Sequence, residues 1–258
     1  MPTRDLVKSS IILFNSINQS CDFGLVQEIV PERKETWQDR NFLTFDLDWC
    51  SDEVLAHTID LVEDAKVPAT WMVTHETPLL GRLHGNERFE VGIHPNFEKL
   101  LHGIDHKGVS GKTVINDLLS FIPMAKTVRS HSMAQSNGLL NLFHEFDLKR
   151  DLNHFIPAHL DQALSPWRHW NDLIRIPCFW EDDIHLLYRY GDKLSPFLKS
   201  AGIRIFNFHP IHVFLNTEDL GRYERCKAKS RDFPHLMSHV NTEKTGTRQR
   251  LDELLSLA

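Results

Sequence analysis

From Asn41 onward the sequence alternates short apolar runs with longer amphipathic stretches, and this alternation restricts the fold more than any other feature. A mostly apolar run of about four to eight residues predicts a strand buried on both faces, as in a parallel sheet. The stretches between runs are long enough for helical crossovers. We therefore expect seven strands, at Phe42–Asp46, Thr70–Val73, Glu90–Ile93, Thr127–Arg129, Leu152–Ile156, Ile174–Phe179 and Ile203–Phe208. Seven such units are enough to close a (β/α) barrel, so the pattern predicts an α/β fold.

Two of the intervening stretches carry clear helix signals. Ser51 is a favourable N-cap residue, and acidic residues follow it in the first turn before apolar residues recur at helical spacing. A second helix is expected from about Lys112 to Phe121, because Pro123 prevents its continuation. Both helices should pack outside the sheet.

The chain of 258 residues is long enough for one large core. It has no repeat of fixed period and no low-complexity tract. We therefore expect a single domain over residues 1–258, with its motif-bearing core at about 41–216 and charged extensions at both ends.

A formal net charge of -6 at pH 7 argues against a nucleic-acid-binding protein, which needs a basic surface to displace counterions. The four cysteines form no C-x-x-C pair and are expected to be reduced thiols. The apolar part of the N-terminal segment, Ile11–Phe14, is too short for a signal peptide or a membrane span. The sequence thus predicts a cytoplasmic protein without a membrane span.

Four of the expected strands end in acidic, basic or metal-binding side chains. Each residue alone has an ordinary explanation, because Asp often caps a helix and His beside Pro often lies in a turn. In parallel sheets, however, functional groups gather at the carboxyl ends of strands. The residues concerned are Asp46, Asp48, His94, Arg129, His131, His209 and His212. Together they predict a functional cluster.

The segment Leu43–Asp48 resembles the first motif of polysaccharide deacetylases, the NodB-like carbohydrate esterases. Four further segments resemble the later motifs of that family, in the family's order. They are Glu90–His94, Arg129–His131 with the arginine, Ile176–Asp183 with the tryptophan, and Phe208–Pro210 with the last histidine. The match spans about residues 41–216.

This resemblance implies a distorted seven-stranded (β/α) barrel that holds one divalent metal ion, usually Zn²⁺ in such enzymes. It also implies hydrolysis of an N-acyl group, typically N-acetyl, on an amino sugar or glycan precursor. Because no export signal is seen, a precursor from a surface-polysaccharide pathway such as that of O-antigen is the expected substrate.

The chain departs from the family pattern at two positions. Leu47 separates Asp46 from Asp48, whereas the family usually has adjacent aspartates. The family's second metal-binding histidine, expected four residues after His94, is replaced by Glu98.

The resemblance makes Asp48 and His94 metal ligands, and the third ligand is open among His131, Glu98 and Asn96. We favour His131, because it lies two residues beyond the motif's arginine and strand alternation directs both to the same side. An Asp-His-His set is one that zinc accepts, with water in the remaining position.

For catalysis, Asp46 is expected to accept the proton of the attacking water, and Arg129 to pair with Asp46 and keep it ionised. His209 is expected to protonate the leaving nitrogen, with His212 as the alternative. Candidate substrate-binding residues are Trp180, Asp182, Asn96 and Trp49. The tryptophan rings suit the C–H faces of a sugar, although such rings more often lie in the core.

Three other functions fit parts of this pattern. A ureide or imide hydrolase would use the same fold and the same centre. A nucleotide-sugar glycosyltransferase would use Asp46-x-Asp48 to hold a metal bound to diphosphate, but it would leave the other candidates unused. A carbohydrate-binding homologue without activity is suggested by the missing second histidine.

Overall fold

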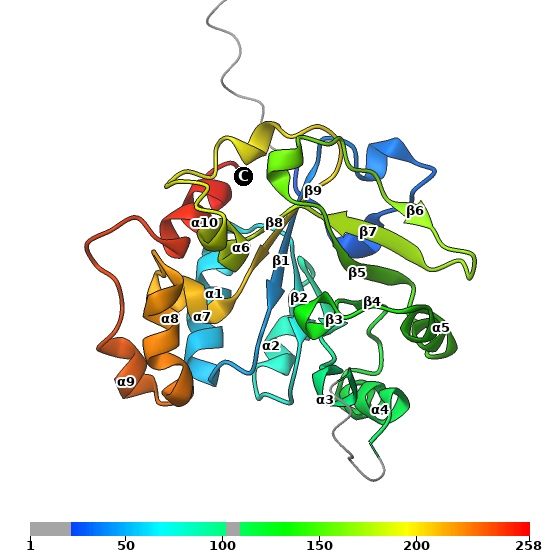
Figure 1. Ribbon diagram of the computed structural model, residues 1–258, viewed down its shortest axis with the longest axis horizontal. Helices are drawn as coiled ribbons and strands as arrows, with labels where there is room; N and C mark the ends of the chain where they lie inside the picture. Colours follow the sequence, from blue (N-terminus) through cyan, green and yellow to red (C-terminus); the bar gives the residue numbers. More distant parts are fainter. Residues whose placement is uncertain (1–21, 102–108) are drawn as a thin grey trace, which may run out of the picture.

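The computed structural model describes residues 22–101 and 109–258, and a single nine-stranded sheet forms its centre (Figure 1). The strands are β1 (Asn41–Asp46), β2 (Ala69–Val73), β3 (Phe89–Ile93), β4 (Thr127–Val128), β5 (Arg150–Phe155), β6 (Trp167–Arg168), β7 (Ile174–Cys178), β8 (Trp180–Glu181) and β9 (Arg204–Phe208). Their order in the sheet is β6-β7-β5-β4-β3-β2-β1-β9-β8. Neighbouring strands are parallel except for β6 and β7, so the carboxyl ends of the long strands meet at one edge.

All seven expected strands are present, but the described residues form nine strands rather than seven. The additional strands β6 and β8 have two residues each and stand at the two edges of the sheet. Segments this short carry no detectable periodicity, which is why the sequence pattern missed them. The sheet curls into a half-barrel with free edges instead of the closed barrel that was expected.

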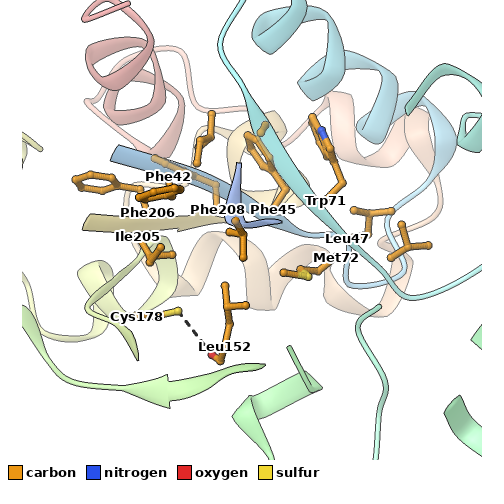
Figure 2. Close-up of a cluster of buried hydrophobic side chains, with 14 of the residues drawn as sticks. Phe42, Phe45, Leu47, Trp71, Met72, Leu152, Cys178, Ile205, Phe206 and Phe208 are labelled. Atoms are coloured by element: carbon orange, nitrogen blue, oxygen red, sulfur yellow. Dashed lines mark hydrogen bonds between the residues drawn. The ribbon is translucent and has the colours of Figure 1, made fainter. Parts of the chain in front are cut away.

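Central strands β1, β2 and β9 are buried at every residue, as the apolar runs predicted. Their aromatic side chains pack closely (Figure 2), and the ring of Phe45 stacks on Trp71 with 4.3 Å between centroids. Truncating a buried aromatic side chain of this kind typically costs about 3–5 kcal/mol. Strands β1 and β9, which end at the site, are therefore anchored in the buried core.

Ten α-helices surround the sheet in the described residues. They are α1 (Asp52–Ala65), α2 (Leu80–Gly85), α3 (Glu98–Leu101), α4 (Gly111–Phe121), α5 (Asn137–Glu145), α6 (Asp182–Leu187), α7 (Pro210–Leu215), α8 (Leu220–Cys226), α9 (Phe233–Met237) and α10 (Thr247–Leu255). Helix α7 packs against α1 and α10 on one side of the sheet, and α4 packs against α5 elsewhere (Figure 1). Short 3-10 helices are Val26–Glu28, Lys34–Thr36, His131–Met133, Ala158–Leu160, Phe197–Lys199 and Lys227–Lys229.

Both expected helices form, and the first has the expected N-cap. The Ser51 side chain accepts a hydrogen bond from the backbone N–H of Val54 at the start of α1. Helix α4 begins at Gly111, one residue earlier than expected, and ends at Phe121 as predicted. The segment Ile11–Phe14 lies outside the described residues. No helix in residues 22–101 and 109–258 is long and apolar enough to cross a membrane.

Candidate metal and catalytic centre

Carboxyl ends of β1, β3, β4 and β9 converge on a cavity of about 300 Å³. Asp46 is the last residue of β1, and the next strand ends supply the other polar side chains. The cavity is lined by Asp46, Asp48, His94, His131 and His209, together with hydroxyl, acidic and apolar residues from β8, α6 and the loop after β4. Strand ends far apart in the sequence therefore meet as predicted.

Asp48, His94 and His131 form a compact group within this cavity. Asp48 Oδ1 lies 3.2 Å from His94 Nε2 and 3.3 Å from His131 Nδ1. Two ligand atoms bound at about 2 Å to a tetrahedral metal are about 3.3 Å apart, so these separations match a shared ion. The two imidazoles also hold the pKa of Asp48 well below its usual range, against the opposing effect of burial.

The turn after β1 explains how Asp46 and Asp48 reach the same cavity although Leu47 separates them. Leu47 is fully buried in the core, and its backbone N–H donates to the carbonyl of Met72. Asp48 and Trp49 then adopt left-handed backbone conformations with φ of 42° and 55°. This reversal brings the Asp48 carboxylate back toward the cavity that Asp46 faces.

The two competing third ligands lie outside the Asp48 group. Glu98 Oε1 accepts a hydrogen bond from Ser132 and lies 3.9 Å from His131 Nε2, the ring nitrogen that faces away from Asp48. Asn96 Oδ1 accepts from the backbone N–H of Glu98 at 2.8 Å and so caps the start of α3. Asn96 therefore stabilises the first turn of α3, and Glu98 contacts the segment that carries His131.

Asp46 is held by a buried guanidinium and a buried amide. Arg129, which is fully buried, donates from Nη2 to Asp46 Oδ1 at 2.7 Å and from Nε to both carboxylate oxygens. Asn207 donates from Nδ2 to Asp46 Oδ2 at 2.9 Å and accepts from Arg129. Burial opposes the ionisation of Asp46, but the charges of Arg129, His94 and His209 outweigh it and lower the pKa of this carboxyl.

His209 faces the two aspartates from the opposite rim. Its Nε2 lies 3.7 Å from Asp48 Oδ2 and 4.0 Å from Asp46 Oδ2. Its Nδ1 lies 2.7 Å from Asp182 Oδ1, and its backbone N–H donates to Asp182 Oδ2. Burial disfavours the charged imidazolium, but Asp182 and the other nearby carboxylates raise the pKa of His209 well above its ordinary value.

The alternative proton donor, His212, lies deeper. Its Nδ1 pairs with the Thr217 hydroxyl at 3.1 Å, and burial lowers its pKa. His212 lines an adjoining cavity of about 410 Å³ that shares Asp48, His131 and His209 with the first. Of the two candidate proton donors, His209 is therefore the one whose ring nitrogen lies within 4.0 Å of both aspartates.

The four candidate substrate-binding residues take different positions. Trp49 lines the adjoining cavity and packs edge-on against His131, with 5.1 Å between ring centroids. Trp180 is fully buried, and its indole N–H donates to His185 Nδ1. Asp182 is occupied by His209, and Asn96 caps α3; neither lines either cavity.

Sequence reasoning missed Asn207 and Glu181. Asn207 lies two residues before His209 on β9, so strand alternation could have placed it on the same side. Glu181 lines the first cavity with a buried Oε1 that has no hydrogen-bond partner among the described residues. Burial together with Asp183 raises the pKa of Glu181 to about 8. No spacing rule identified Glu181, because it sits on a two-residue strand.

A larger cavity, about 470 Å³, opens between α6 and α8. Three clusters of His, Cys, Asp and Glu are compact enough to hold a metal within residues 22–101 and 109–258, and none has a member lining this cavity. We therefore place the candidate chemistry in the smaller cavity at the strand ends.

Comparisons with known proteins identify the family of the chain. No curated protein sequence matches the chain. A crystal structure from Bordetella bronchiseptica, named as a polysaccharide deacetylase involved in O-antigen biosynthesis (WbmS), is 41% identical, with a TM-score of 0.87. The similarity covers 93% of this chain and 99% of that one.

A Mycobacterium smegmatis structure named as a polysaccharide deacetylase is 15% identical over 66% of this chain and 76% of that one. Its TM-score is 0.42. The family model described as WbmS-like polysaccharide deacetylase matches residues 43–227, which include every candidate site residue. The chain belongs to the WbmS-like polysaccharide deacetylase family.

Proposed function

We propose that this chain is a metal-dependent deacetylase that removes an N-acyl group, in the simplest case N-acetyl, from an amino sugar of a glycan precursor. One observation carries the proposal. The group of Asp48, His94 and His131 faces the Nε2 atom of His209 within one cavity, so ligand atoms and a proton donor converge on the same space.

The metal would be held by Asp48 Oδ1, His94 Nε2 and His131 Nδ1. One carboxylate and two imidazoles suit Zn²⁺, and three protein ligands leave a coordination position for water or substrate. When bound, such an ion polarises the acyl carbonyl and lowers the pKa of water. Glu98, beyond the outer ring nitrogen of His131, would fix the orientation of that ring.

Asp46 would accept the proton of the attacking water. Arg129 and Asn207 leave this carboxylate ionised and restrict its rotation, so the base is oriented before substrate binds. The same contacts argue against a glycosyltransferase that uses both aspartates of Asp46-x-Asp48, because the Asp46 carboxylate is already bound by a guanidinium and an amide.

His209 would donate a proton to the departing amine. The carboxylate of Asp182 holds the ring with Nε2 toward the cavity and keeps it protonated at neutral pH. Without that proton the leaving group would depart as an unstable amide anion, so the donor matters most for amide substrates.

The substrate would be a glycan precursor in the cytoplasm. The 41% identical structure is named for O-antigen biosynthesis, which supports an amino sugar of a surface polysaccharide. Trp49 lines the adjoining cavity and would offer a flat face to a sugar ring.

To test the proposal, purified protein is stripped of metal, reloaded with Zn²⁺ and assayed for acetate release from N-acetylglucosamine oligomers and from an aryl acetate. Metal removal should abolish both reactions, and Asp46→Asn should retain zinc but lose turnover by roughly 10²–10⁴-fold. Hydrolysis that is indifferent to metal would refute the proposed function. Release of zinc by Asp46→Asn with retention by Asp48→Ala would exchange the two roles.

A further inference from the structure

A second group of side chains that can bind a metal lies between the end of α8 and the turn after α9. Cys226 is the last residue of α8, His235 lies in α9, and His239 follows the end of α9. One ligand atom from each lies within 4.8 Å of the others, the same criterion that the Asp48 group meets. The proposed deacetylase mechanism uses none of the three.

Position and exposure of these side chains suit an ion at the edge of the fold. Cys226 is fully buried and is not in a disulfide, whereas both histidines are partly exposed. His235 lies in α9 and His239 in the turn that follows it, yet their ring centroids are only 4.4 Å apart. Both rings can therefore reach one ion together with the thiol.

Hydrogen bonds fix His239 in a ligand-like orientation. Its Nδ1 lies 2.9 Å from the backbone carbonyl of His235 and 3.0 Å from the Ser238 hydroxyl. Metal-binding histidines commonly donate one ring N–H to a carbonyl in this way, which leaves the other nitrogen free as a ligand. Arg222 of α8 donates to the backbone carbonyl of His239 at 2.5 Å, so the helix that carries Cys226 also anchors His239.

We propose that Cys226, His235 and His239 form a second metal site, separate from the catalytic centre, that takes Zn²⁺ or another divalent ion with affinity for thiolate. A sulfur and two imidazole nitrogens are a donor set that zinc accepts, and water would complete the tetrahedron. Basic residues of α8 and of the 3-10 helix after it would repel a cation. Coordination by the Cys226 sulfur is therefore the interaction that would make the ion bind.

Binding would release one proton. Such ions bind the thiolate rather than the thiol, so the thiol proton is displaced. On binding, the S–H bond breaks, the sulfur gives its electron pair to the ion, and the proton leaves to solvent. The ion would then join α8 to α9, a structural role, and would steady Arg231, which donates to the backbone carbonyl of Trp49 beside the catalytic cavity.

Cobalt substitution distinguishes this site from the catalytic one without any activity assay. Thiolate coordination of Co²⁺ produces a near-ultraviolet charge-transfer band, whereas the Asp48 group contains no sulfur. Full-length protein should bind two equivalents of Co²⁺ and show the band. Asp48→Ala should lose one equivalent and keep the band; Cys226→Ala should lose the other equivalent together with the band.

Because Cys226 is buried, its replacement can impair folding, so His239→Ala serves as the second variant at a partly exposed position. It should weaken Co²⁺ binding at the thiolate site by at least about tenfold, with unchanged far-ultraviolet circular dichroism. Absence of the band in wild-type protein, or its persistence in Cys226→Ala, would overturn the proposal. Loss of the band in Asp48→Ala would show that there is no separate site.

Discussion

Two clusters of one carboxylate and two imidazoles lie near the catalytic cavity, yet their hydrogen bonding differs. In the Asp48 group a single carboxylate oxygen lies at 3.2 and 3.3 Å from two ring nitrogens, at distances that an ion between them would produce. In the group of Asp182, His209 and His212, both Asp182 oxygens already accept from His209, at 2.7 and 2.9 Å.

Exposure follows the same division. The side chains of Asp48 and His131 are 20% and 23% exposed, whereas Asp182 is fully buried. An ion that enters the first group would replace one long hydrogen bond, between His131 Nδ1 and Asp48 Oδ1 at 3.3 Å. In the second group it would have to replace two shorter ones, at 2.7 and 2.9 Å. The residue types alone would allow a metal in either group. The hydrogen bonds distinguish them: the Asp48 group suits a metal centre, and the Asp182 group suits a proton donor.

Metal content gives the largest expected contrast. Asp48→Ala should lose the catalytic ion with an affinity change greater than the roughly 10–100-fold that removal of an outer-shell partner costs. Asp182→Asn should keep the ion, because the native Asp182 carboxylate binds His209 and not the metal. Elemental analysis after equilibrium dialysis measures the metal content of both variants. Both substitutions are made in the Cys226→Ala protein, so that metal at the thiolate site does not contribute. Metal loss in Asp182→Asn with retention in Asp48→Ala would reverse the comparison.

A leaving-group series tests the proton-donor side. His209→Ala should lower kcat by roughly 10²–10⁴-fold for an N-acetyl amide and far less for an activated aryl ester, whose leaving group needs no proton. Zinc content should stay unchanged, and His212→Ala is the matched control at the deeper ring. Equal losses on amide and ester by a folded His209→Ala protein would remove the assigned role.

The pH profile sharpens the pairing of His209 with Asp182. Because the folded-state pKa of His209 is raised, kcat should be constant through neutral pH and fall only as pH rises through that elevated value. Asp182→Asn removes the charge that raises the pKa, so the alkaline fall should move to lower pH. Profiles of kcat from pH 5 to about 10 with the two proteins measure this shift. An unmoved alkaline limb would mean that another group controls it.

The smallest effect is expected at the outer face of the metal group. Glu98→Ala should lower zinc affinity only slightly, within the roughly 10–100-fold range of an orienting partner, because Glu98 lies 3.9 Å from the outer nitrogen of His131. His131→Ala should lower it by orders of magnitude. Competition with a chromophoric chelator ranks the two, and the reverse ranking would make Glu98 the ligand.

Apolar runs were sufficient to predict the six strands of five or six residues, and the two-residue strand β4 was also expected, at Thr127–Arg129. They could not reveal β6 or β8, which have two residues each, nor the open edges that they leave. The structure brings Asp48, His94 and His131 together as predicted, but not through strand alternation. Asp48 reaches the cavity through the left-handed turn after β1, and His131 begins a 3-10 helix beyond the end of β4.

Predictions that depended on the surroundings of a side chain succeeded less well. Trp180 was expected to contact the substrate, but it is fully buried against His185 and Phe208. An indole ring packs in a hydrophobic core as well as it packs against a sugar ring, so the residue type alone does not decide between the two. Glu181 was passed over although it lines the cavity, because burial and an absent partner cannot be read from neighbouring residues in the sequence.

The paired left-handed residues after β1 have a consequence for ion choice. Neither Asp48 nor Trp49 is glycine, so each costs of order 1–3 kcal/mol in this conformation, and bonds such as that from Trp49 N–H to Thr74 hold them there. This conformational free energy is supplied during folding, so the Asp48 carboxylate is ordered before an ion binds. Binding therefore causes little further loss of conformational entropy in this turn. A preorganised ligand that cannot shift its backbone should discriminate between ions by radius and coordination geometry, and should reject larger cations such as Ca²⁺, which need a more adaptable shell.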